Sequence, residues 1–236
     1  MSRLRERADA AAQVLVEDLE HPEATESDAH HLRRVLRLRD GERVVACDGM
    51  GSWRLCAVAA GGDLEVAGDI VVEPAPSAPV RVWLPAVKGE RAEWAVAKLT
   101  ELGVDEIGLL SCDRAVVRLD EETAARVLAR WRRVARESSC QSRRARLPLI
   151  DGPATMAQAA SLGARRCDLE GDAPAGLAAS LAVGPEGGWS DAERDAAPGA
   201  VGLARTVLRT ETAAVAAGVV LTLARGARHA WPPEAQ

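Results

Sequence analysis

The chain changes its pattern at a proline-rich segment, and this change constrains the fold more than any single residue does. Residues 73–80, EPAPSAPV, contain three prolines and are expected to link two domains. Before this segment lie short strand-like runs separated by Asp-Gly and Gly-Gly turns, whereas after it strand-like and helix-like runs alternate. Such alternation predicts a parallel sheet with helices on both faces, so the chain is expected to be an α/β protein.

The first part of the chain is expected to form a small β-barrel-like module. Four runs have the composition of strands: AQVLVE, RVVACDG, WRLCAV and DIVVE. One helix is predicted within SDAHHLRRVLRL, with Ser27 as its N-cap and Asp28 in its first turn. The predicted limits are residues 1–73 for this module, 74–80 for the linker and 81–236 for the second domain.

The second part is expected to supply the parallel sheet. Its predicted strands are VRVWLPAV, EIGLLSC, RLPLI, RRCDLE, LAASLAV and AVGLA. Its predicted helices are ERAEWAVAKLTELG, which Gly103 closes at the C′ position, then DEETAARVLARWRRVARESSCQS, ATMAQAASL, SDAERDAA and TAAVAAGVVLTLARGA. Ligands of open parallel sheets bind beyond the carboxyl ends of the strands, so a site is expected in the loops that follow these strands.

Composition narrows the class of protein. The 236 residues are 47% hydrophobic and 28% charged, which is typical of a globular chain. No apolar run is long enough to cross a bilayer, and the charged N-terminus is unlike a secretory signal, so no membrane partner is expected. The five cysteines are scattered without a C-x-x-C pair, so neither a disulfide framework nor a metal site is predicted. A cytoplasmic location is expected.

Arginines cluster on a chain whose net charge is −5. Between Arg126 and Arg146 there are eight arginines and a single acid, Glu137, and a smaller cluster lies in HHLRRVLRLRDGER. Local basic patches bind phosphate backbones, but they also cover solvated helix faces, and the sequence leaves both interpretations open. The same alternatives hold for the polar residues at the predicted end of the long helix, Gln141, Ser142, Arg143 and Arg144.

A glycine-rich loop, GPEGG at residues 184–188, follows the predicted strand LAASLAV. A capping box, Ser190 with Glu193, starts the next helix. Glycines allow backbone groups to approach a ligand closely, but the loop matches no mononucleotide signature and its Glu186 would repel a triphosphate. The loop suits a neutral or cationic ligand. Alternatively, it is a tight turn that requires a positive φ at one of its last two glycines.

A second stretch, LARTVLRTETAAVAAGVVL, places Arg209 and Glu211 between an apolar run and an apolar helix. Charged residues at such a junction are costly to bury unless they are paired or used. A simple helix start, with Thr210 as the cap and Glu211 favourable to the helix dipole, explains Glu211 well and Arg209 poorly.

Taken together, these stretches resemble a known family. The order GPEGGWS-x-x-E followed by LRTETA, together with LPAVKGERAEWAVAKLTELGVDEI and HHLRRVLRLRDGE, resembles the RsmE family of 16S ribosomal RNA (uracil-1498-N3) methyltransferases. The resemblance covers nearly the whole chain in the family's order. It implies an N-terminal PUA-like β-barrel that binds RNA and a C-terminal SPOUT α/β domain whose chain forms a trefoil knot. It also implies a homodimer acting on 16S rRNA of the small ribosomal subunit.

The resemblance further implies a site for S-adenosylmethionine in the knot, without a metal. The residues expected to bind this cofactor are Leu169, Gly184, Pro185, Glu186, Gly187, Gly188, Leu203, Val207, Leu208 and Arg209. Arg209 is expected to stabilise charge on the uracil carbonyl oxygens, and Glu211 to orient the base or accept its N3 proton. The residues expected to contact RNA are Arg33, Arg34, Arg37, Gln141, Arg143 and Arg144.

The sequence departs from the family's pattern in two places near the expected site. The family's E-Q-S-G-R run is Cys140 to Arg144 here, and its L-G-x-R run is Leu203 to Thr206. Two alternatives stay open at this stage. The chain could be a SPOUT enzyme that modifies another RNA or another position, or a catalytically silent RNA-binding protein.

Overall fold

The computed structural model describes residues 3–174 and 179–228, and within them the chain forms two compact units. One unit contains the residues up to Pro76 together with Arg136–Leu147, and the other contains Ser77–Ala135 and the residues from Pro148 onward. The sequence did not indicate that the segment Arg136–Leu147 belongs with the N-terminal part. The domain limits inferred from the sequence stay a prediction.

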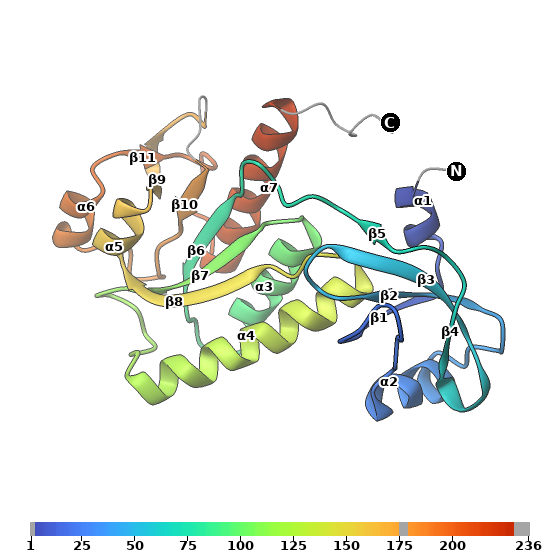
Figure 1. Ribbon diagram of the computed structural model, residues 1–236. Helices are drawn as coiled ribbons and strands as arrows, with labels where there is room; N and C mark the ends of the chain where they lie inside the picture. The colour runs from blue at the N-terminus through green and yellow to red at the C-terminus, as the bar shows by residue number, and fades with distance from the viewer. Residues whose placement is uncertain (1–2, 175–178, 229–236) are drawn as a thin grey trace. The chain divides into compact units, whose positions relative to one another are not determined.

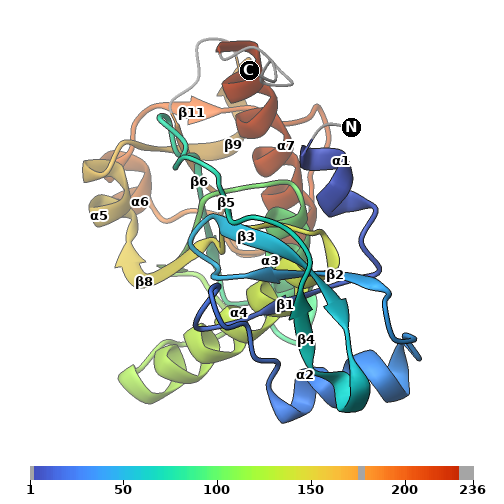
Figure 2. The same cartoon turned by 45° about the vertical axis from the view of Figure 1, so that its right-hand side comes forward.

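The first unit is built on a five-stranded sheet. Its elements are α1 (Arg3–Ala8), β1 (Ala12–Leu15), α2 (Glu26–His30), a π-helical turn (His31–Val35), β2 (Arg43–Cys47), β3 (Ser52–Val58), a 3-10 turn (Ala60–Gly62), β4 (Leu64–Val66) and β5 (Val71–Val72). The strands β1, β2 and β3 lie side by side (Figures 1 and 2), with β1 parallel to β2 and β2 antiparallel to β3. The four strand-like runs expected from the sequence are confirmed, and β4 is an addition.

The predicted N-cap at Ser27 is wrong. The helix α2 begins at Glu26, and Thr25 is its N-cap, with the Thr25 hydroxyl accepting a hydrogen bond of 3.1 Å from the Asp28 backbone N–H. Thr25 has the extended backbone that a cap requires, so the helix starts earlier than the sequence suggested. Leu32, in the π-helical turn that follows α2, is fully buried among the side chains of β2 and β3.

The second unit contains a six-stranded sheet in the order β11-β9-β10-β6-β7-β8, with every recorded pair parallel. The strands are β6 (Arg81–Pro85), β7 (Glu106–Ser111), β8 (Leu149–Thr155), β9 (Ala164–Asp172), β10 (Ser180–Ala182) and β11 (Ala200–Val201). The parallel sheet expected from the sequence is confirmed. The strand β8 begins later than RLPLI suggested, because Arg146 instead forms an isolated bridge with Met50 in the first unit.

Helices cover both faces of this sheet, as Figure 1 shows. They are α3 (Arg91–Glu101), α4 (Glu121–Gln141), α5 (Met156–Ser161), α6 (Asp191–Ala196) and α7 (Thr210–Arg228). Alternate strand residues enter opposite cores: Leu84 packs in the core of α3, α4 and α7, whereas Trp83 packs in a second core with α5 and with Trp189 and Ala197, which flank α6. The sheet is therefore buried on both faces, as strands of parallel sheets usually are.

The helices α3 and α7 pack closely where Gly218 faces Leu99, since a Cβ at Gly218 would lie 2.5 Å from a Leu99 methyl carbon. The predicted end of α3 is confirmed: Gly103 has a φ of 80°, and the Val104 N–H donates to the Leu99 carbonyl. The trefoil knot stays a prediction. Within residues 3–174 and 179–228, no helix combines the length and apolarity that a bilayer span requires.

Candidate active site

A cavity of about 480 Å³ lies in the second unit, against the middle of β9 and beyond the carboxyl ends of β10 and β11. Its walls come from β9, from the loop after β10 and from the segment that joins β11 to α7. The volume is within the range of small-molecule and cofactor sites. The lining residues are Cys167, Asp168, Leu169, Val183, Gly184, Pro185, Glu186, Gly188, Trp189, Arg194, Leu203, Ala204, Thr206, Val207, Leu208, Arg209, Thr210 and Ala213.

The loop at residues 184–188 lines the cavity, and the shape of the loop itself requires glycines. A Cβ at Gly184 would lie 2.9 Å from the Trp189 ring, and Gly188 has a φ of 69°. Gly187 packs away from the cavity, since its Cβ would lie 2.7 Å from the Arg114 carbonyl oxygen. The loop is therefore a tight turn with a positive φ at Gly188, and it is also a wall of the cavity, whereas its binding of a ligand stays a prediction.

The helix after the loop is fixed by its cap. The predicted capping box of Ser190 and Glu193 is confirmed, with Ser190 Oγ accepting from the Glu193 N–H and Glu193 Oε2 accepting from the Ser190 N–H. The buried Glu193 carboxylate also accepts from the Asp113 N–H at 3.0 Å, which ties α6 to the loop after β7. The start of α6, directly after the glycine loop, is therefore fixed both by its own cap and by the loop after β7.

The start of α7 faces the glycine loop. The hydroxyl of Thr210 donates to the Gly184 carbonyl at 3.0 Å, so Thr210 joins two walls of the cavity, and its interpretation as a simple helix cap is wrong. Arg209 lines the cavity and is exposed. Among the residues that the structure describes, its guanidinium group has neither a hydrogen bond nor an ion pair. A free guanidinium at a cavity wall can stabilise negative charge on a bound substrate.

Glu211 lies behind the wall and not in it. Only 9% of the residue is exposed, it does not line the cavity, and Oε2 is buried without a hydrogen bond among the described residues. The nearest cation is Arg91, whose Nη1 is 3.8 Å from Glu211 Oε2 and whose Nη2 is 3.0 Å from Glu186 Oε1.

Sequence reasoning missed Arg91. It is the first residue of α3, where the helix dipole favours anions, so a basic residue there was the available signal.

A second charged cluster lies on β9 and α6. The Asp168 carboxylate pairs with Arg166, and its Oδ2 lies 2.6 Å from Arg194 Nη1. Both Asp168 and Arg194 line the cavity, whereas Arg166 is buried. Cys167 lies beside them, and burial raises the pKa of its thiol to about 12. This thiol therefore stays protonated at neutral pH and is not a candidate nucleophile.

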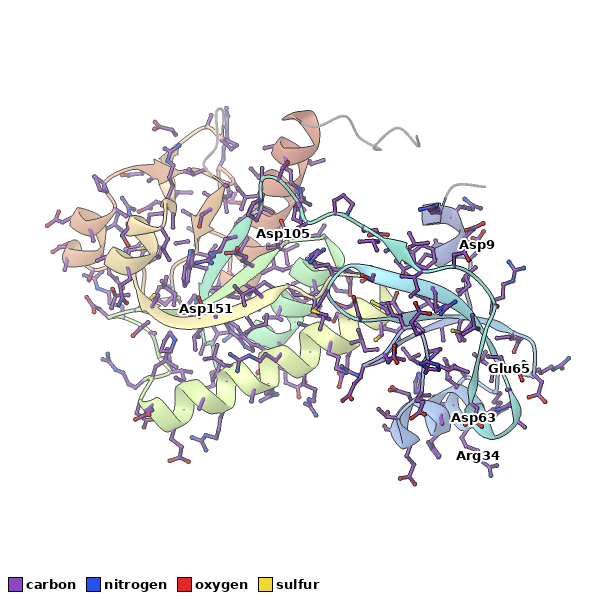
Figure 3. The ribbon with its side chains drawn as sticks, viewed as in Figure 1. Asp9, Arg34, Asp63, Glu65, Asp105 and Asp151 are labelled. Atoms are coloured by element: carbon purple, nitrogen blue, oxygen red, sulfur yellow. The ribbon has the colours of Figure 1, made fainter. Side chains whose placement is uncertain are left out.

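The expected RNA-contacting residues fall into two groups. The exposed group comprises Arg34, Arg37 and Gln141. Arg34 lies at the outer edge of the first unit (Figure 3). The other three have polar contacts within the first unit. The Arg33 guanidinium donates to the Leu38 carbonyl and pairs with Asp40. Arg144 Nε donates to the Arg146 carbonyl at 2.5 Å.

Arg143 is the most constrained of these residues. Its guanidinium donates to the carbonyl oxygens of Ala10, Ala11 and Cys140 at 3.0, 2.8 and 2.8 Å. Burial lowers the pKa of this guanidinium, and the Arg143 backbone has a φ of 57°. A fourth carbonyl, that of Gln141, accepts at 3.4 Å, and a guanidinium with four carbonyl partners holds neighbouring segments in place, so its structural role is evident from the geometry.

Known proteins resemble this chain over most of its length. A family model described as an RNA methyltransferase domain matches residues 73–222, and one described as an RNA methyltransferase PUA domain matches residues 24–71. The ribosomal RNA small subunit methyltransferase E of Mycobacterium tuberculosis is 35% identical over 217 residues, which cover 82% of this chain and 83% of that protein. The Bacillus subtilis protein of the same name is 25% identical over 216 residues, covering 80% of this chain and 84% of that protein.

Among solved structures, the fold resembles that of a ribosomal RNA small subunit methyltransferase E from Neisseria gonorrhoeae bound to S-adenosyl methionine. The TM-score is 0.74 at 24% identity, covering 90% of this chain and 97% of that chain. The chain therefore belongs to the RNA methyltransferase family that includes ribosomal RNA small subunit methyltransferase E, the family that its motifs resemble.

Proposed function

We propose that the protein transfers a methyl group from S-adenosylmethionine to N3 of a uridine in 16S ribosomal RNA of the small subunit. The observation that carries this proposal is the cavity itself. One wall is the glycine loop, another is the segment 203–208 with its apolar residues Leu203, Val207 and Leu208, and the cavity is also lined by Arg209, whose guanidinium has no partner among the described residues. Family membership supports the reaction class, and the motif LRTETA supports the choice of base and atom.

The residues present suit the proposed cofactor. Adenosine is uncharged and offers N–H and O–H donors, which match backbone carbonyls around Gly184 and an apolar wall that includes Leu203 and Leu208. The sulfonium is cationic and tolerates the carboxylate of Glu186 nearby. When bound, S-adenosylmethionine supplies an electrophilic methyl group. Leu169, Pro185, Gly188 and Val207 complete the proposed contacts, whereas Gly187 acts through the shape of the loop.

The chain's own residues would carry the remaining chemistry. Uracil N3 bears a proton, so attack requires its removal and stabilisation of negative charge on the flanking carbonyl oxygens. Arg209 has the free charge for that stabilisation. The family resemblance assigns to Glu211 the orientation of the base or the acceptance of its proton, but the geometry favours this role less than that of Arg209, because Glu211 is buried and does not line the cavity.

The proposal includes an RNA surface and a second copy of the chain. Arg34, Arg37 and Gln141 are exposed and are assigned to phosphate and sugar contacts, whereas the geometry favours Arg33, Arg143 and Arg144 less.

A homodimer is supported by exposed apolar side chains on two helices that pack together: Trp94 of α3 is 49% exposed and Leu223 of α7 is 68% exposed. A cytoplasmic location follows from the proposed substrate.

The test is to map methylated nucleotides in 16S rRNA by mass spectrometry after incubation with the protein and radiolabelled S-adenosylmethionine. Free 16S rRNA and assembled small subunits should be compared as substrates. A single new N3-methyluridine is expected with wild-type protein, and the Arg209→Ala variant is expected to form it about a hundredfold more slowly. Methylation of another nucleotide, or of a ribose, would overturn the assignment of the target atom. Cofactor binding without any transfer would indicate a silent RNA-binding protein.

A further inference from the structure

Arg91 joins two carboxylates that belong to different walls of the candidate site. Its guanidinium lies 3.0 Å from Glu186 on the glycine loop and 3.8 Å from Glu211 at the start of α7. Along the chain, β7, α4, β8, α5, β9 and β10 lie between Arg91 and both partners, so only the fold brings them together.

The three side chains are more enclosed than an ordinary surface ion pair. Their exposed fractions are 39% for Arg91, 34% for Glu186 and 11% for Glu211. Two carboxylates and one guanidinium carry a net charge of −1, so without Arg91 the carboxylates would face each other with no cation between them. Repulsion between like charges in a partly buried setting would separate the loop from the helix.

We propose that Arg91 is a positioning residue of the methyltransferase site, which holds the glycine loop and the start of α7 in register. This inference rests on the proposed function for its catalytic consequence. Thr210 makes the second connection between the same two walls, through its hydrogen bond to Gly184. Arg209 lies next to Thr210 in the chain, so the alignment of its guanidinium over the cavity depends on both connections.

A matched control exists on the neighbouring helix. Arg130 of α4 also pairs with two glutamates, at 3.1 Å from Glu93 and 3.7 Å from Glu90, and its exposed fraction is 46%. Neither Arg130 nor its partners line the cavity. Replacing Arg130 therefore removes ion pairs of the same residue types from outside the cavity, although the exposed fraction of Glu90 is 90% and only Glu93, at 15%, is as enclosed as the partners of Arg91.

The first experiment needs no cofactor and no RNA. Backbone amide hydrogen exchange should be measured by mass spectrometry on wild type, Arg91→Ala, Arg91→Lys and Arg130→Ala. Exchange in residues 184–188 and in the first turn of α7 should be about tenfold faster in Arg91→Ala. It should be unchanged in Arg130→Ala and restored at least in part in Arg91→Lys. Unchanged exchange of both segments in Arg91→Ala would overturn the positioning role.

The second experiment is a single-turnover methylation assay with the same variants and with Glu211→Gln. Arg91→Ala should lower the rate constant roughly thirtyfold, and combining it with Glu211→Gln should cause little further loss, because the two residues act together. Additive losses, or a rate equal to that of Arg130→Ala, would overturn the inference. If wild-type protein methylates no rRNA while Arg91→Ala still loosens the loop, the proposed function fails and the positioning role stands.

Discussion

Arg143 in the first unit and Arg209 in the second unit have opposite surroundings. In the first unit, Arg143 and Arg33 are hydrogen-bonded to backbone carbonyls, and these contacts hold neighbouring segments together. In the second unit, Arg209 stands at a cavity wall with a guanidinium that has no recorded partner among the described residues. The number of arginines in a stretch therefore says little about function. What matters is whether the donors of each guanidinium are already occupied.

The largest effect is expected from the free arginine. Arg209→Ala should lower the single-turnover methylation rate by about a hundredfold, because a positioned charge at a reacting group contributes that much in other enzymes. The free energy of unfolding should change by less than about 0.5 kcal/mol, since no described contact is lost. Measuring the methylation rate and urea unfolding on the same preparation separates a loss of catalysis from a loss of stability. A rate within threefold of wild type would remove Arg209 from the mechanism.

Replacing Arg143, whose guanidinium is already hydrogen-bonded, should affect stability more than activity. Arg143→Ala leaves the carbonyls of Ala10, Ala11 and Cys140 without their donor, and it should lower the free energy of unfolding by roughly 2 kcal/mol. Arg34→Ala is the control, because Arg34 is exposed at the edge of the same unit. If both substitutions leave stability unchanged and weaken RNA binding equally, the contrast between free and occupied guanidiniums is wrong.

A smaller effect is expected where the two walls of the cavity meet. Thr210→Val keeps the shape of the side chain but removes the hydrogen bond to the Gly184 carbonyl, which should cost about 1 kcal/mol of stability. The affinity for S-adenosylmethionine, measured by calorimetry, should fall with it, since both groups line the cavity. Thr222→Val on the same helix is a suitable control, because its hydroxyl bonds only within α7. Equal effects of the two substitutions would argue against a specific link.

The smallest expected effect is a loss of stability at high pH that comes from a buried cysteine in each unit. Burial raises the pKa of Cys47 in the first unit to about 11 and that of Cys167 in the second to about 12, from an ordinary value of 9.0. The folded state thus holds the proton more tightly than the unfolded state does. These thiols therefore contribute constant stability below pH 9, and the contribution is lost as the pH rises from 9 towards these values. Urea unfolding at pH 8 and pH 10 should show a smaller decrease in Cys167→Ala than in wild type, and an equal decrease would contradict the assignment.

Much of the fold could be predicted from local patterns. The alternation of strand-like and helix-like runs after residue 80 was sufficient to predict the parallel sheet, and the Gly103 stop and the Ser190–Glu193 capping box are confirmed. These signals are local because hydrophobic periodicity and helix caps depend on neighbouring residues. The N-cap at Ser27 failed for a related reason: Thr25 offered an equivalent hydroxyl two residues earlier, and the sequence contains nothing to rank the two.

The candidate site was predictable as a set of loops but not as an arrangement of charges. The motifs GPEGG and LRTETA indicated which segments to compare, and the structure brings both to one cavity. The sequence could not show that Arg91 pairs with Glu186 and Glu211, that Gly187 faces Arg114, or that Arg143 is occupied by carbonyls. Each of these contacts joins residues far apart in the chain.

The sequence by itself therefore determined the classes of secondary structure, their order and the family to which the chain belongs. Only the tertiary structure decided which charged groups are free to act and which are already paired. The physical reason is that propensity and periodicity act over a few residues, whereas the environment of a guanidinium or carboxylate depends on every segment that folds against it.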